Sequence, residues 1–478
     1  MARGALPKKE SVWRCLRCSE CLDANAGVFA CRACGQEYPI VQGVAVLVHD
    51  PIGYLRSELT SLDRAQRAAV QRRRWIDTEG PNSGLTEASL RRHGDVLDTE
   101  IARIEAFLAL LGPTRAMLAS SPNEQQQGSA ARGSGWGFDA LFPYLLRDWT
   151  GTQELRSAAS IIGEALQSAF PERAEKTIAF AGCGAAGLLD EIALDFEQVV
   201  GFDLTFPVLA AARRLLDGKE LSVPMPHAVN DSGSIVLRRR RATGSPSTVQ
   251  LAAMDAFETA FATDSIDCVV TSFLLDLLPD PTRLAKEIHR VLRADGVWIN
   301  YGPSGPVQSL WRFDAPEGRA FFEAAGFNVL NCNATRATYL DLSRDCPSWS
   351  FQNHVCYLTV ARKTSGGFAT PNSPIPVTGD LLDAIPEHHR SAVLIRRQRL
   401  SGEKSTRLLL QYERLPGRNE TFEISGDAAR ILELVDGQRS IREIARLAEK
   451  FEPARAASDT AHVLATYLEQ NVLKWRSS

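Results

Sequence analysis

Thr177-Ile-Ala-Phe-Ala-Gly-Cys-Gly-Ala-Ala-Gly187 is the stretch that decides the fold of this chain of 478 residues. Its first five residues form an apolar run typical of a strand, a glycine-rich turn follows, and residues 188–194 are typical of a helix. A strand, a glycine-rich turn and a helix open a nucleotide-binding α/β sheet, because glycines let the backbone approach a ligand and the helix N-terminus offers free N–H groups. The pattern alone fits nicotinamide dinucleotides equally well.

A second predicted strand, Val199-Val-Gly-Phe-Asp203, ends in an acid about 20 residues after the glycine-rich turn. In nucleotide-binding sheets an acid at this place accepts hydrogen bonds from ribose hydroxyls. We therefore expect Asp203 to hold the ribose of a nucleoside cofactor.

Three later features distinguish between the nucleoside cofactors. Ala253-Met-Asp-Ala256 precedes an apolar strand at residues 265–272, an amphipathic helix follows at 281–292, and residues 293–300 form a turn and a strand. This order resembles that of class I methyltransferases, in which an acid at the position of Asp255 lies near the adenine of the cofactor. It differs from the order in nicotinamide dehydrogenases. The sequence therefore predicts an α/β fold with a Rossmann-like class I methyltransferase core and S-adenosylmethionine as the cofactor.

Several separated motifs resemble the carnosine N-methyltransferase family, whose members methylate an imidazole nitrogen of a His-containing dipeptide. Trp298-Ile-Asn-Tyr-Gly-Pro303 is similar to that family's WINLGP segment. Asp267-Cys-Val-Val-Thr-Ser-Phe-Leu-Leu-Asp276 is similar to its DCVATCFFIDT, and Leu146-Arg-Asp-Trp-Thr150 to its VRDWS. The resemblance covers residues 139–363, the closing strands included.

The resemblance implies a role for each matching residue. Arg147 would bind the carboxylate of the cofactor's methionyl part, a task that suits a planar guanidinium. The other residues expected around the cofactor are Gly182, Gly184, Gly187, Asp203, Asp255, Ala256 and Ser272. Asp276 matches an acid that the family uses on its substrate.

The acceptor side departs from the family. The family's GPLLYHF segment, whose His helps to hold the substrate, is replaced by residues 302–308, which contain no His. Tyr144 stands where the family has a glutamine, and His354 falls at one of its tyrosines. The methyl-transfer residues are thus retained while the acceptor pocket differs, which argues against carnosine itself as the acceptor.

These residues predict an N-methyltransferase that acts on an imidazole or amine nitrogen of a small molecule or short peptide, with Asp276 and His354 as catalytic residues. Asp276 could accept the acceptor's second N–H, fix its tautomer and stabilise the cation that forms. Two alternatives stay open, because Asp276 could instead cap the helix that begins near Pro281 and His354 could be a packed side chain. Phe273 and Tyr301 could wall the acceptor pocket or belong to the core.

Five of the ten cysteines lie within residues 15–34. Cys15-Leu-Arg-Cys18 and Cys31-Arg-Ala-Cys34 are two CxxC turns, and four thiolates supply the tetrahedral set that structural zinc prefers. We expect zinc at these four cysteines; Cys21 could replace Cys15, and free cysteines without metal are the alternative. The segment that follows, residues 38–47, resembles the tail of the Trm112-like zinc ribbons fused to many bacterial methyltransferases.

A proline-rich segment at residues 370–376 indicates a linker before a C-terminal module. A strand hairpin is expected at residues 392–397 and 406–412, and helices at 427–435, 440–450 and 458–471. Residues 431–451 resemble the PqqD-like winged-helix domains, which bind leader peptides of ribosomally made peptides, and such a peptide would add a strand to the hairpin edge. DNA binding and a structural or dimerising role are the alternatives, and the mixed charge of the candidate recognition helix argues against DNA.

The chain therefore divides into five predicted segments. They are a zinc ribbon at residues 1–50, a helical region with a flexible connector at 51–138, the methyltransferase core at 139–365, a linker at 366–385 and a PqqD-like winged-helix domain at 386–478. Two functional hypotheses follow. The chain is either a methyltransferase of a small-molecule or peptide acceptor, or a peptide-tailoring methyltransferase whose C-terminal domain binds a precursor leader peptide.

Composition bears on the partners and the compartment. A formal net charge of −3 gives no drive toward nucleic acid or an anionic membrane, and the basic run at residues 238–241 is expected to be a solvated loop. No apolar run approaches the roughly 18–20 residues that span a bilayer, and the N-terminus lacks an apolar signal core. We therefore expect a cytoplasmic enzyme with no nucleic-acid or membrane partner.

Overall fold

The computed structural model describes residues 12–25, 27–120, 138–192, 196–225, 233–240, 249–278, 281–303, 315–340, 352–365, 386–388, 393–398, 406–415, 418–424, 431–436, 438–448 and 473–475. The chain forms two compact units. The first comprises residues 1–304 and 313–369, and the second comprises residues 305–312 and 370–478. Every residue predicted at the cofactor, the acceptor or the metal belongs to the first unit.

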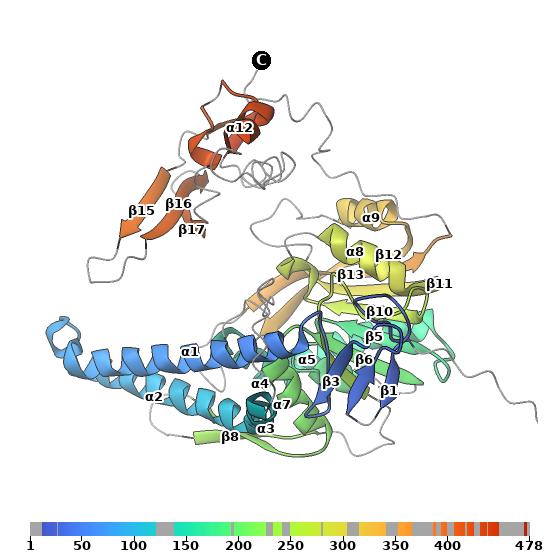
Figure 1. The fold of residues 1–478 in the computed structure, drawn as a ribbon, viewed down its shortest axis with the longest axis horizontal. Helices are drawn as coiled ribbons and strands as arrows, with labels where there is room; N and C mark the ends of the chain where they lie inside the picture. Colours follow the sequence, from blue (N-terminus) through green and yellow to red (C-terminus); the bar gives the residue numbers. More distant parts are fainter. Residues whose placement is uncertain are drawn as a thin grey trace, which may run out of the picture. The chain divides into compact units, whose positions relative to one another are not determined.

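One large sheet runs through the first unit (Figure 1). In spatial order its strands are β1 (Asp23–Asn25), β2 (Val28–Ala30), β3 (Glu37–Val41), β4 (Val44–Leu47), β9 (Val249–Met254), β6 (Gln198–Asp203), β5 (Thr177–Ala181), β10 (Ile266–Ser272), β11 (Leu292–Gly302), β13 (Gln352–Lys363) and β12 (Phe327–Leu340). Neighbouring strands are parallel from β4 to β11, whereas β13 runs antiparallel to both β11 and β12. Counted from β5, the strands β9-β6-β5-β10-β11 have the order 3-2-1-4-5 of a doubly wound sheet. The predicted α/β fold class is therefore confirmed at the level of a mixed α/β fold with a large, mostly parallel sheet.

Helices cover both faces of this sheet (Figure 1). On one face lie α4 (Phe138–Trp149), α5 (Gln153–Ala169), α6 (Gly187–Ile192) and α7 (Phe206–Leu216), and on the other lie α8 (Pro281–Val291) and α9 (Ala315–Ala324). Trp298 of β11 is fully buried, packs against the rings of Phe322 and Phe327, and donates its indole N–H to the Thr271 hydroxyl. The tryptophan of the motif at residues 298–303 is thus part of the core.

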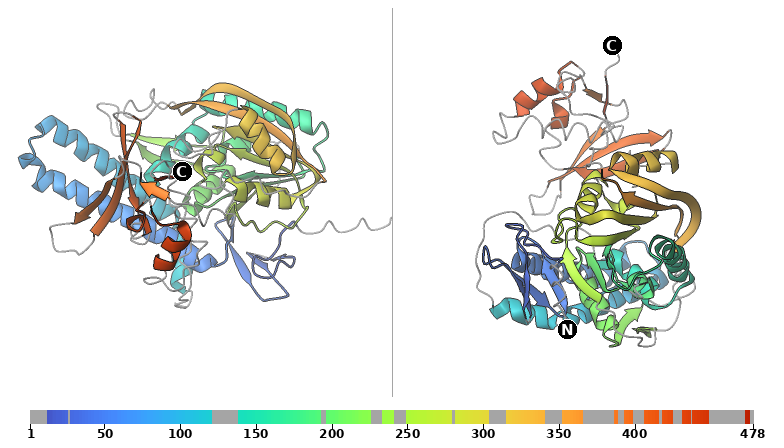
Figure 2. Two further views of the ribbon diagram at one scale, coloured as in Figure 1. Left: turned by 90° about the horizontal axis from the view of Figure 1, so that it is seen from above. Right: turned by 90° about the vertical axis from the view of Figure 1, so that its right-hand side faces the viewer.

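The Cys-rich segment joins this sheet directly. Its last strand, β4, pairs in parallel with β9 through the contact of Val44 with Leu251 and of Leu47 with Met254. Val44, Val46 and Leu47 are fully buried, and the right-hand view of Figure 2 shows the N-terminal strands beside the sheet. The sheet therefore continues across the domain boundary predicted at residue 50.

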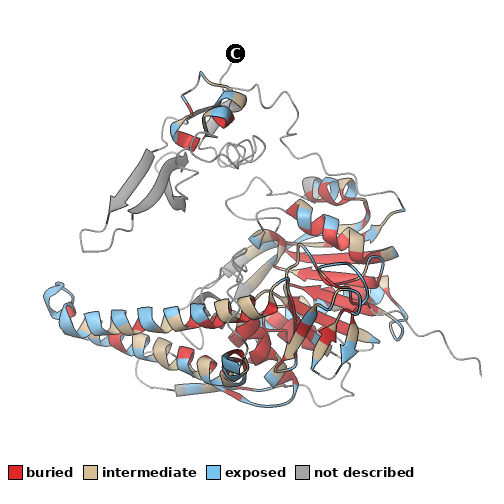
Figure 3. Ribbon diagram, viewed as in Figure 1, coloured by how far each residue is buried: buried red, intermediate tan, exposed pale blue. Residues whose placement is uncertain are grey.

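Two long helices form a hairpin that extends away from the sheet (Figures 1 and 2). The region consists of α1 (Pro51–Thr78), the 3-10 turn η1 (Gly80–Asn82), α2 (Glu87–Leu110) and α3 (Gly112–Ser120), which confirms the helices predicted there. Asp50 caps α1 by accepting the Gly53 N–H, and the outer part of the hairpin is exposed whereas Tyr54 at its root is buried (Figure 3). None of the helices in the described part of the chain has both the length and the apolarity that crossing a bilayer requires.

The basic run at residues 238–241 is not wholly solvated. It follows the hairpin of β7 (Leu221–Met225) and β8 (Gly233–Leu237), and the Arg239 guanidinium lies 2.6 Å from the carboxylate of buried Asp190. The prediction of a solvated loop is therefore wrong for Arg239, because a buried carboxylate requires a charged partner.

The second unit contains a three-stranded antiparallel sheet. Its described elements are β14 (Pro386–His388), β15 (Val393–Gln398), β16 (Thr406–Leu415), β17 (Arg418–Ile424), α12 (Ile441–Ala448) and β18 (Leu473–Trp475). The predicted hairpin of β15 and β16 is confirmed and gains β17 as a third strand. Ser440 and Glu443 cap α12 reciprocally, each side chain accepting the other's backbone N–H. The helix predicted at residues 458–471 lies outside the described residues.

Candidate functional site

The glycine-rich turn between β5 and α6 forms the floor of the site. Gly182 and Gly184 have φ angles of +65° and +52°, which side chains rarely adopt. A Cβ atom at Gly182 would lie 2.8 Å from Leu274, whereas one at Gly184 would enter open space. The backbone of this turn therefore faces a cavity, as the sequence predicted.

Asp203 at the end of β6 links two loops of the site. One of its carboxylate oxygens accepts the Gly184 N–H at 3.0 Å, and the other accepts the Thr205 N–H at 3.0 Å. Burial raises the pKa of this carboxyl group, and the two backbone donors oppose that rise. Each carboxylate oxygen can accept a second hydrogen bond, so a ligand hydroxyl can still bind.

Tyr54 supports the same region from the root of α1. Its hydroxyl donates to the Leu204 carbonyl at 2.8 Å and accepts the Phe206 N–H at 3.0 Å. The helical hairpin thus fixes the loop that follows Asp203. No local sequence signal indicates this contact, since the two segments are 150 residues apart.

The end of α4 contacts the glycine-rich turn through two consecutive residues, Asp148 and Trp149. Asp148 accepts the Gly187 N–H at 3.1 Å, and Trp149 donates its indole N–H to the Ala185 carbonyl at 2.9 Å. Asp148 also accepts two hydrogen bonds from the guanidinium of Arg147, at 2.8 and 2.7 Å. The sequence motif that contains these residues pointed to Arg147 alone, and the supporting roles of Asp148 and Trp149 were missed.

A cavity of about 450 Å³ opens above the carboxyl ends of the parallel strands. Among its lining residues are the predicted site residues Arg147, Gly182, Gly184, Asp203, Asp255, Ala256, Ser272, Asp276 and His354. Gly187, also expected at the cofactor, does not line this cavity because Asp148 covers it: a Cβ at Gly187 would lie 2.5 Å from that of Asp148. Residues from five different elements thus converge on one space.

One end of this cavity is aromatic and holds a partly buried acid. Phe273 has a φ angle of +51°, unusual for a bulky residue, and its ring packs edge-on against Tyr301 and His354. Burial raises the pKa of Asp276 to about 6 and lowers that of His354. One buried oxygen of Asp276 has no hydrogen-bond partner among the described residues.

A second cavity of about 200 Å³ shares three lining residues, Arg147, Ser272 and Phe273, with the first. It also contains Glu154 from α5 and Arg336 from β12. Within the described residues neither of these two side chains forms an ion pair. The second cavity therefore offers both a carboxylate and a guanidinium next to the first cavity.

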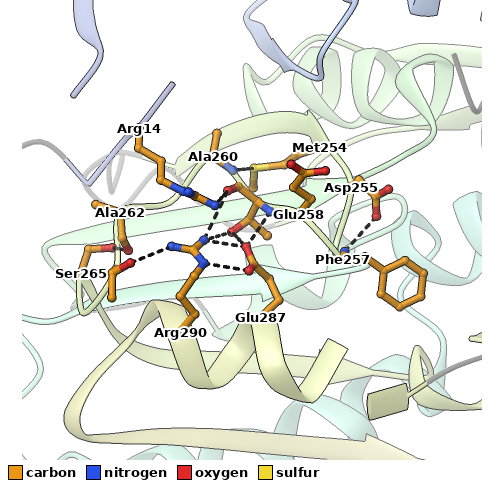
Figure 4. A network of polar contacts seen from close by, with 12 residues as sticks. Arg14, Met254, Asp255, Phe257, Glu258, Ala260, Ala262, Ser265, Glu287 and Arg290 are labelled. Carbon is orange, nitrogen blue, oxygen red and sulfur yellow. Dashed lines mark hydrogen bonds and ion pairs between the residues drawn. The ribbon is translucent and has the colours of Figure 1, made fainter. Parts of the chain in front are cut away.

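The loop after β9, which includes Asp255, is held by a network of polar contacts (Figure 4). Asp255 accepts the Phe257 N–H at 2.8 Å, and Glu287 accepts both the N–H and the hydroxyl of Thr259 at 2.7 and 2.6 Å. Burial disfavours the charge on Glu287, but its contacts with Arg290 and Thr259 together outweigh burial and lower its pKa. This network fixes the loop beside the cavity.

The Cys-rich segment supports the same loop. The Arg14 guanidinium donates to the Thr259 carbonyl at 3.3 Å, and its backbone N–H donates to the Ala260 carbonyl at 2.7 Å. The Trp13 ring stacks on Phe261 with centroids 4.9 Å apart. Trp13 and Arg14 directly precede Cys15, so these contacts connect the cysteine cluster to the loop that contains Asp255.

The four predicted metal ligands lie together. The Sγ atoms of Cys15, Cys18, Cys31 and Cys34 are all within 4.8 Å of one another, and Cys21 is outside this group. The pair Cys15–Cys34 is 3.6 Å apart and the pair Cys18–Cys31 is 3.4 Å apart. Tetrahedral zinc with sulfur ligands at about 2.3 Å would place sulfurs roughly 3.8 Å apart. The donor set therefore fits a structural zinc ion.

Comparison with known proteins identifies the core. Residues 180–299 match the family described as "Methyltransferase domain". No protein with a curated function matches the chain significantly. A SAM-dependent methyltransferase of Methanosarcina mazei is similar in structure at 14% identity, over 40% of this chain and 94% of that protein, with a TM-score of 0.28.

The phosphoethanolamine N-methyltransferase 2 of Haemonchus contortus, solved with S-adenosyl-L-methionine, is similar at 17% identity over 42% of this chain and 52% of that protein, with a TM-score of 0.30. Similarities this low carry no argument about function. The family match spans β5 to β11, the segment that builds the glycine-rich turn, the Asp203 and Asp255 loops and the floor of the cavity. On that match, the chain is an S-adenosylmethionine-dependent methyltransferase.

Proposed function

We propose that this enzyme methylates an imidazole or amine nitrogen of a small molecule or short peptide. The observation that carries this proposal is Asp276: a partly buried side chain with one buried, unpartnered carboxylate oxygen, in the wall of a cavity that Phe273 and His354 also line. A buried polar atom without a partner is unfavourable unless a ligand supplies one. An N–H group or a nitrogen that becomes cationic is the partner that a carboxylate prefers.

The cofactor would lie along the glycine-rich turn. Its carboxylate would meet Arg147, its ribose Asp203, and its adenine the loop of Asp255 and Ala256. Gly182, Gly184 and Ser272 would form the wall. The match between this set and the cavity supports the arrangement, because a nucleoside with a charged amino-acid end needs a cation at one end and an acid at the sugar.

The bound cofactor supplies an electrophilic methyl group on a positively charged sulfur. The protein's task is to align the acceptor and exclude water, which can contribute about 7–11 kcal/mol in favourable intramolecular reactions. Asp276 would accept the N–H of the acceptor, hold the reacting nitrogen in its nucleophilic form, and stabilise the positive charge that develops. His354, whose pKa is lowered by burial, would be neutral and would wall the pocket as a hydrogen-bonding partner.

The second cavity would receive the remainder of the acceptor. It is adjacent to the cofactor cavity, with which it shares three lining residues, and Arg336 and Glu154 would meet polar or charged groups. We also propose that the four-cysteine cluster holds a structural zinc ion, since all four ligands are thiols and none leaves a catalytic position open.

A second candidate function is peptide tailoring. The outer strands β15 and β17 of the second unit each pair on one side only within the described residues. Such an edge can accept an extended peptide as a further strand, which supports a role for this unit in binding a precursor leader peptide.

Mass spectrometry of the full chain with S-adenosylmethionine tests both candidates. The substrates would be His-containing dipeptides, simple amines and peptides with and without an N-terminal leader. Gain of one methyl group on a nitrogen of a dipeptide or amine supports the first candidate. Methylation only of peptides that carry a leader supports the second. Methyl transfer to oxygen or carbon alone would contradict the first candidate, and methylation that is independent of a leader would contradict the second.

A further inference from the structure

Asp148 occupies an unusual place between the glycine-rich turn and Arg147. Its side chain is only 1% exposed. One carboxylate oxygen accepts the Nε–H and Nη2–H of Arg147, and the other accepts the Gly187 N–H at the start of α6. Both oxygens are therefore engaged, one by a side chain that lines the cavity and one by the backbone under it.

This arrangement changes which group can bind the anionic end of a ligand. The start of a helix attracts anions because its first N–H groups have no partner within the helix. At α6 the Gly187 N–H already donates to Asp148, so a protein carboxylate stands where the sequence predicted room for the cofactor. The guanidinium of Arg147 is therefore the group that remains to bind the cofactor's carboxylate.

Arg147 itself needs to be held in place. An arginine side chain has about 2 kcal/mol of rotamer entropy, and an unsupported guanidinium loses it only when a ligand binds. The paired contact with Asp148 orients the guanidinium plane in advance, in the wall shared by the two cavities. Trp149 fixes the same turn of α4 to the Ala185 carbonyl, so the whole segment is anchored to the glycine-rich turn.

We propose that Asp148 is a positioning residue that acts through Arg147: it orients the guanidinium that binds the carboxylate of S-adenosylmethionine. This inference rests on the proposed function, which gives Arg147 that carboxylate. It predicts that Asp148 increases the affinity only for ligands that have an amino-acid end.

Two probes separate this role from general support of the fold. S-Adenosylhomocysteine has the amino-acid end, whereas 5′-methylthioadenosine has the same adenine, ribose and sulfur without it. Calorimetry on the full chain should show that Asp148→Asn weakens the binding of S-adenosylhomocysteine about 10-fold to 100-fold, the range for a hydrogen bond to a charged group. Binding of 5′-methylthioadenosine should stay within about twofold of the wild type.

A double-mutant cycle tests whether Asp148 acts through Arg147. In the Arg147→Ala background, adding Asp148→Asn should cause no further loss of S-adenosylhomocysteine affinity. Arg147→Lys, which keeps the charge but cannot form the paired contact, should show the same selective loss and provides the test if Asp148→Asn folds poorly.

Two matched variants serve as controls. Tyr54→Phe loosens the loop after Asp203 and should weaken the binding of both probes alike, since both contain the ribose. Trp149→Phe removes the neighbouring hydrogen bond to the turn but keeps the contacts of Arg147 with Asp148, so it should discriminate between the probes much less than Asp148→Asn does.

The possible failures are distinguishable. If Arg147→Ala discriminates between the probes but Asp148→Asn weakens both equally, or remains harmful in the Arg147→Ala background, Asp148 supports the fold only and the inference is overturned. If Arg147→Ala does not discriminate, or the wild type binds neither probe, the proposed role of Arg147 falls and the inference falls with it.

Discussion

Asp276 carries a charge that the fold itself disfavours. Burial raises its pKa from 3.8 to about 6, because the ionised form loses water on folding. A group whose pKa is higher in the folded than in the unfolded state stabilises the protein fully in acid, and this contribution is lost as the pH rises through the folded value. At neutral pH the charged Asp276 therefore opposes folding, as is common for groups that meet a ligand.

We predict that Asp276→Asn lowers kcat/KM for the acceptor about 100-fold, the cost of losing one electrostatic contact to a developing charge. In the wild type kcat/KM should rise with pH through about 6, as Asp276 ionises, and the variant should lose this rise. The pH profile of kcat/KM between pH 5 and pH 8, measured under steady-state conditions, checks both statements.

The same variant should be more stable than the wild type at pH 8, by up to about 3 kcal/mol, since the neutral amide avoids burying a charge. The difference should vanish near pH 4, where the wild-type carboxyl group is protonated. Urea unfolding at both pH values measures this, and a variant destabilised equally at both would show that Asp276 has a structural partner instead.

Close packing against Asp148 leaves no room for a side chain at Gly187. A Cβ atom there would lie 2.5 Å from the Cβ and 2.6 Å from the carbonyl oxygen of Asp148. We predict that Gly187→Ala destabilises the protein by about 1–3 kcal/mol and lowers the affinity for S-adenosylhomocysteine, because Asp148 must move. Thermal unfolding and calorimetry measure the two effects.

Gly163 of α5 provides the matched control. A Cβ atom at this position meets nothing within 4 Å, so Gly163→Ala should be neutral or stabilise the helix by up to about 1 kcal/mol. Equal destabilisation by both substitutions would contradict the packing argument.

At the scale of elements, the N-terminal strands extend the catalytic sheet instead of forming a separate module. β4 pairs with β9, and the segment before Cys15 contacts the loop that contains Asp255. Strands as short as β1 and β2 cannot be stable alone, so a metal at the four cysteines would fix the fold of this segment. Order in the cysteine cluster and order in the Asp255 loop should therefore be linked.

We predict that Cys18→Ser, or removal of metal by a chelator, lowers both the melting temperature and the affinity for S-adenosylhomocysteine. The loss of affinity should be several-fold, since the Asp255 loop keeps its contacts with Glu287. Metal content by mass spectrometry should fall from one zinc per chain to none. Cys21→Ser is the control, because Cys21 is exposed and outside the cluster, and it should keep the metal and the affinity.

The elements differ in how far the sequence predicted them. β5, β6, β10 and β11 and the turns between them have strong local patterns, namely apolar runs followed by glycines or acids, and the sequence predicted them in order. The pairing of β4 with β9 joins segments about 200 residues apart and leaves no local signal, so it was not predicted. The same holds for the contact of Asp148 with Gly187, which joins the end of α4 to a glycine that the sequence assigned to the cofactor.

At the scale of the molecule, the two compact units contain different elements and sites. Every residue that lines the larger cavity lies in the first unit, as does the cysteine cluster. The second unit has its own sheet and its own capped helix. Compact units with separate cores unfold as separate transitions when few contacts join them.

We predict that S-adenosylhomocysteine shifts only one of two unfolding transitions in scanning calorimetry. A ligand at 100 times its dissociation constant stabilises the state that binds it by about 2.7 kcal/mol, which raises the melting temperature by roughly several degrees for a unit of this size. Because the cavity belongs to the first unit, chelation of metal should lower the same transition that the ligand raises. Opposite shifts of one transition, with the other unmoved, would assign both effects to the first unit. A ligand that raised both transitions equally would mean instead that the units unfold together, and that the second unit contributes to the stability of the site.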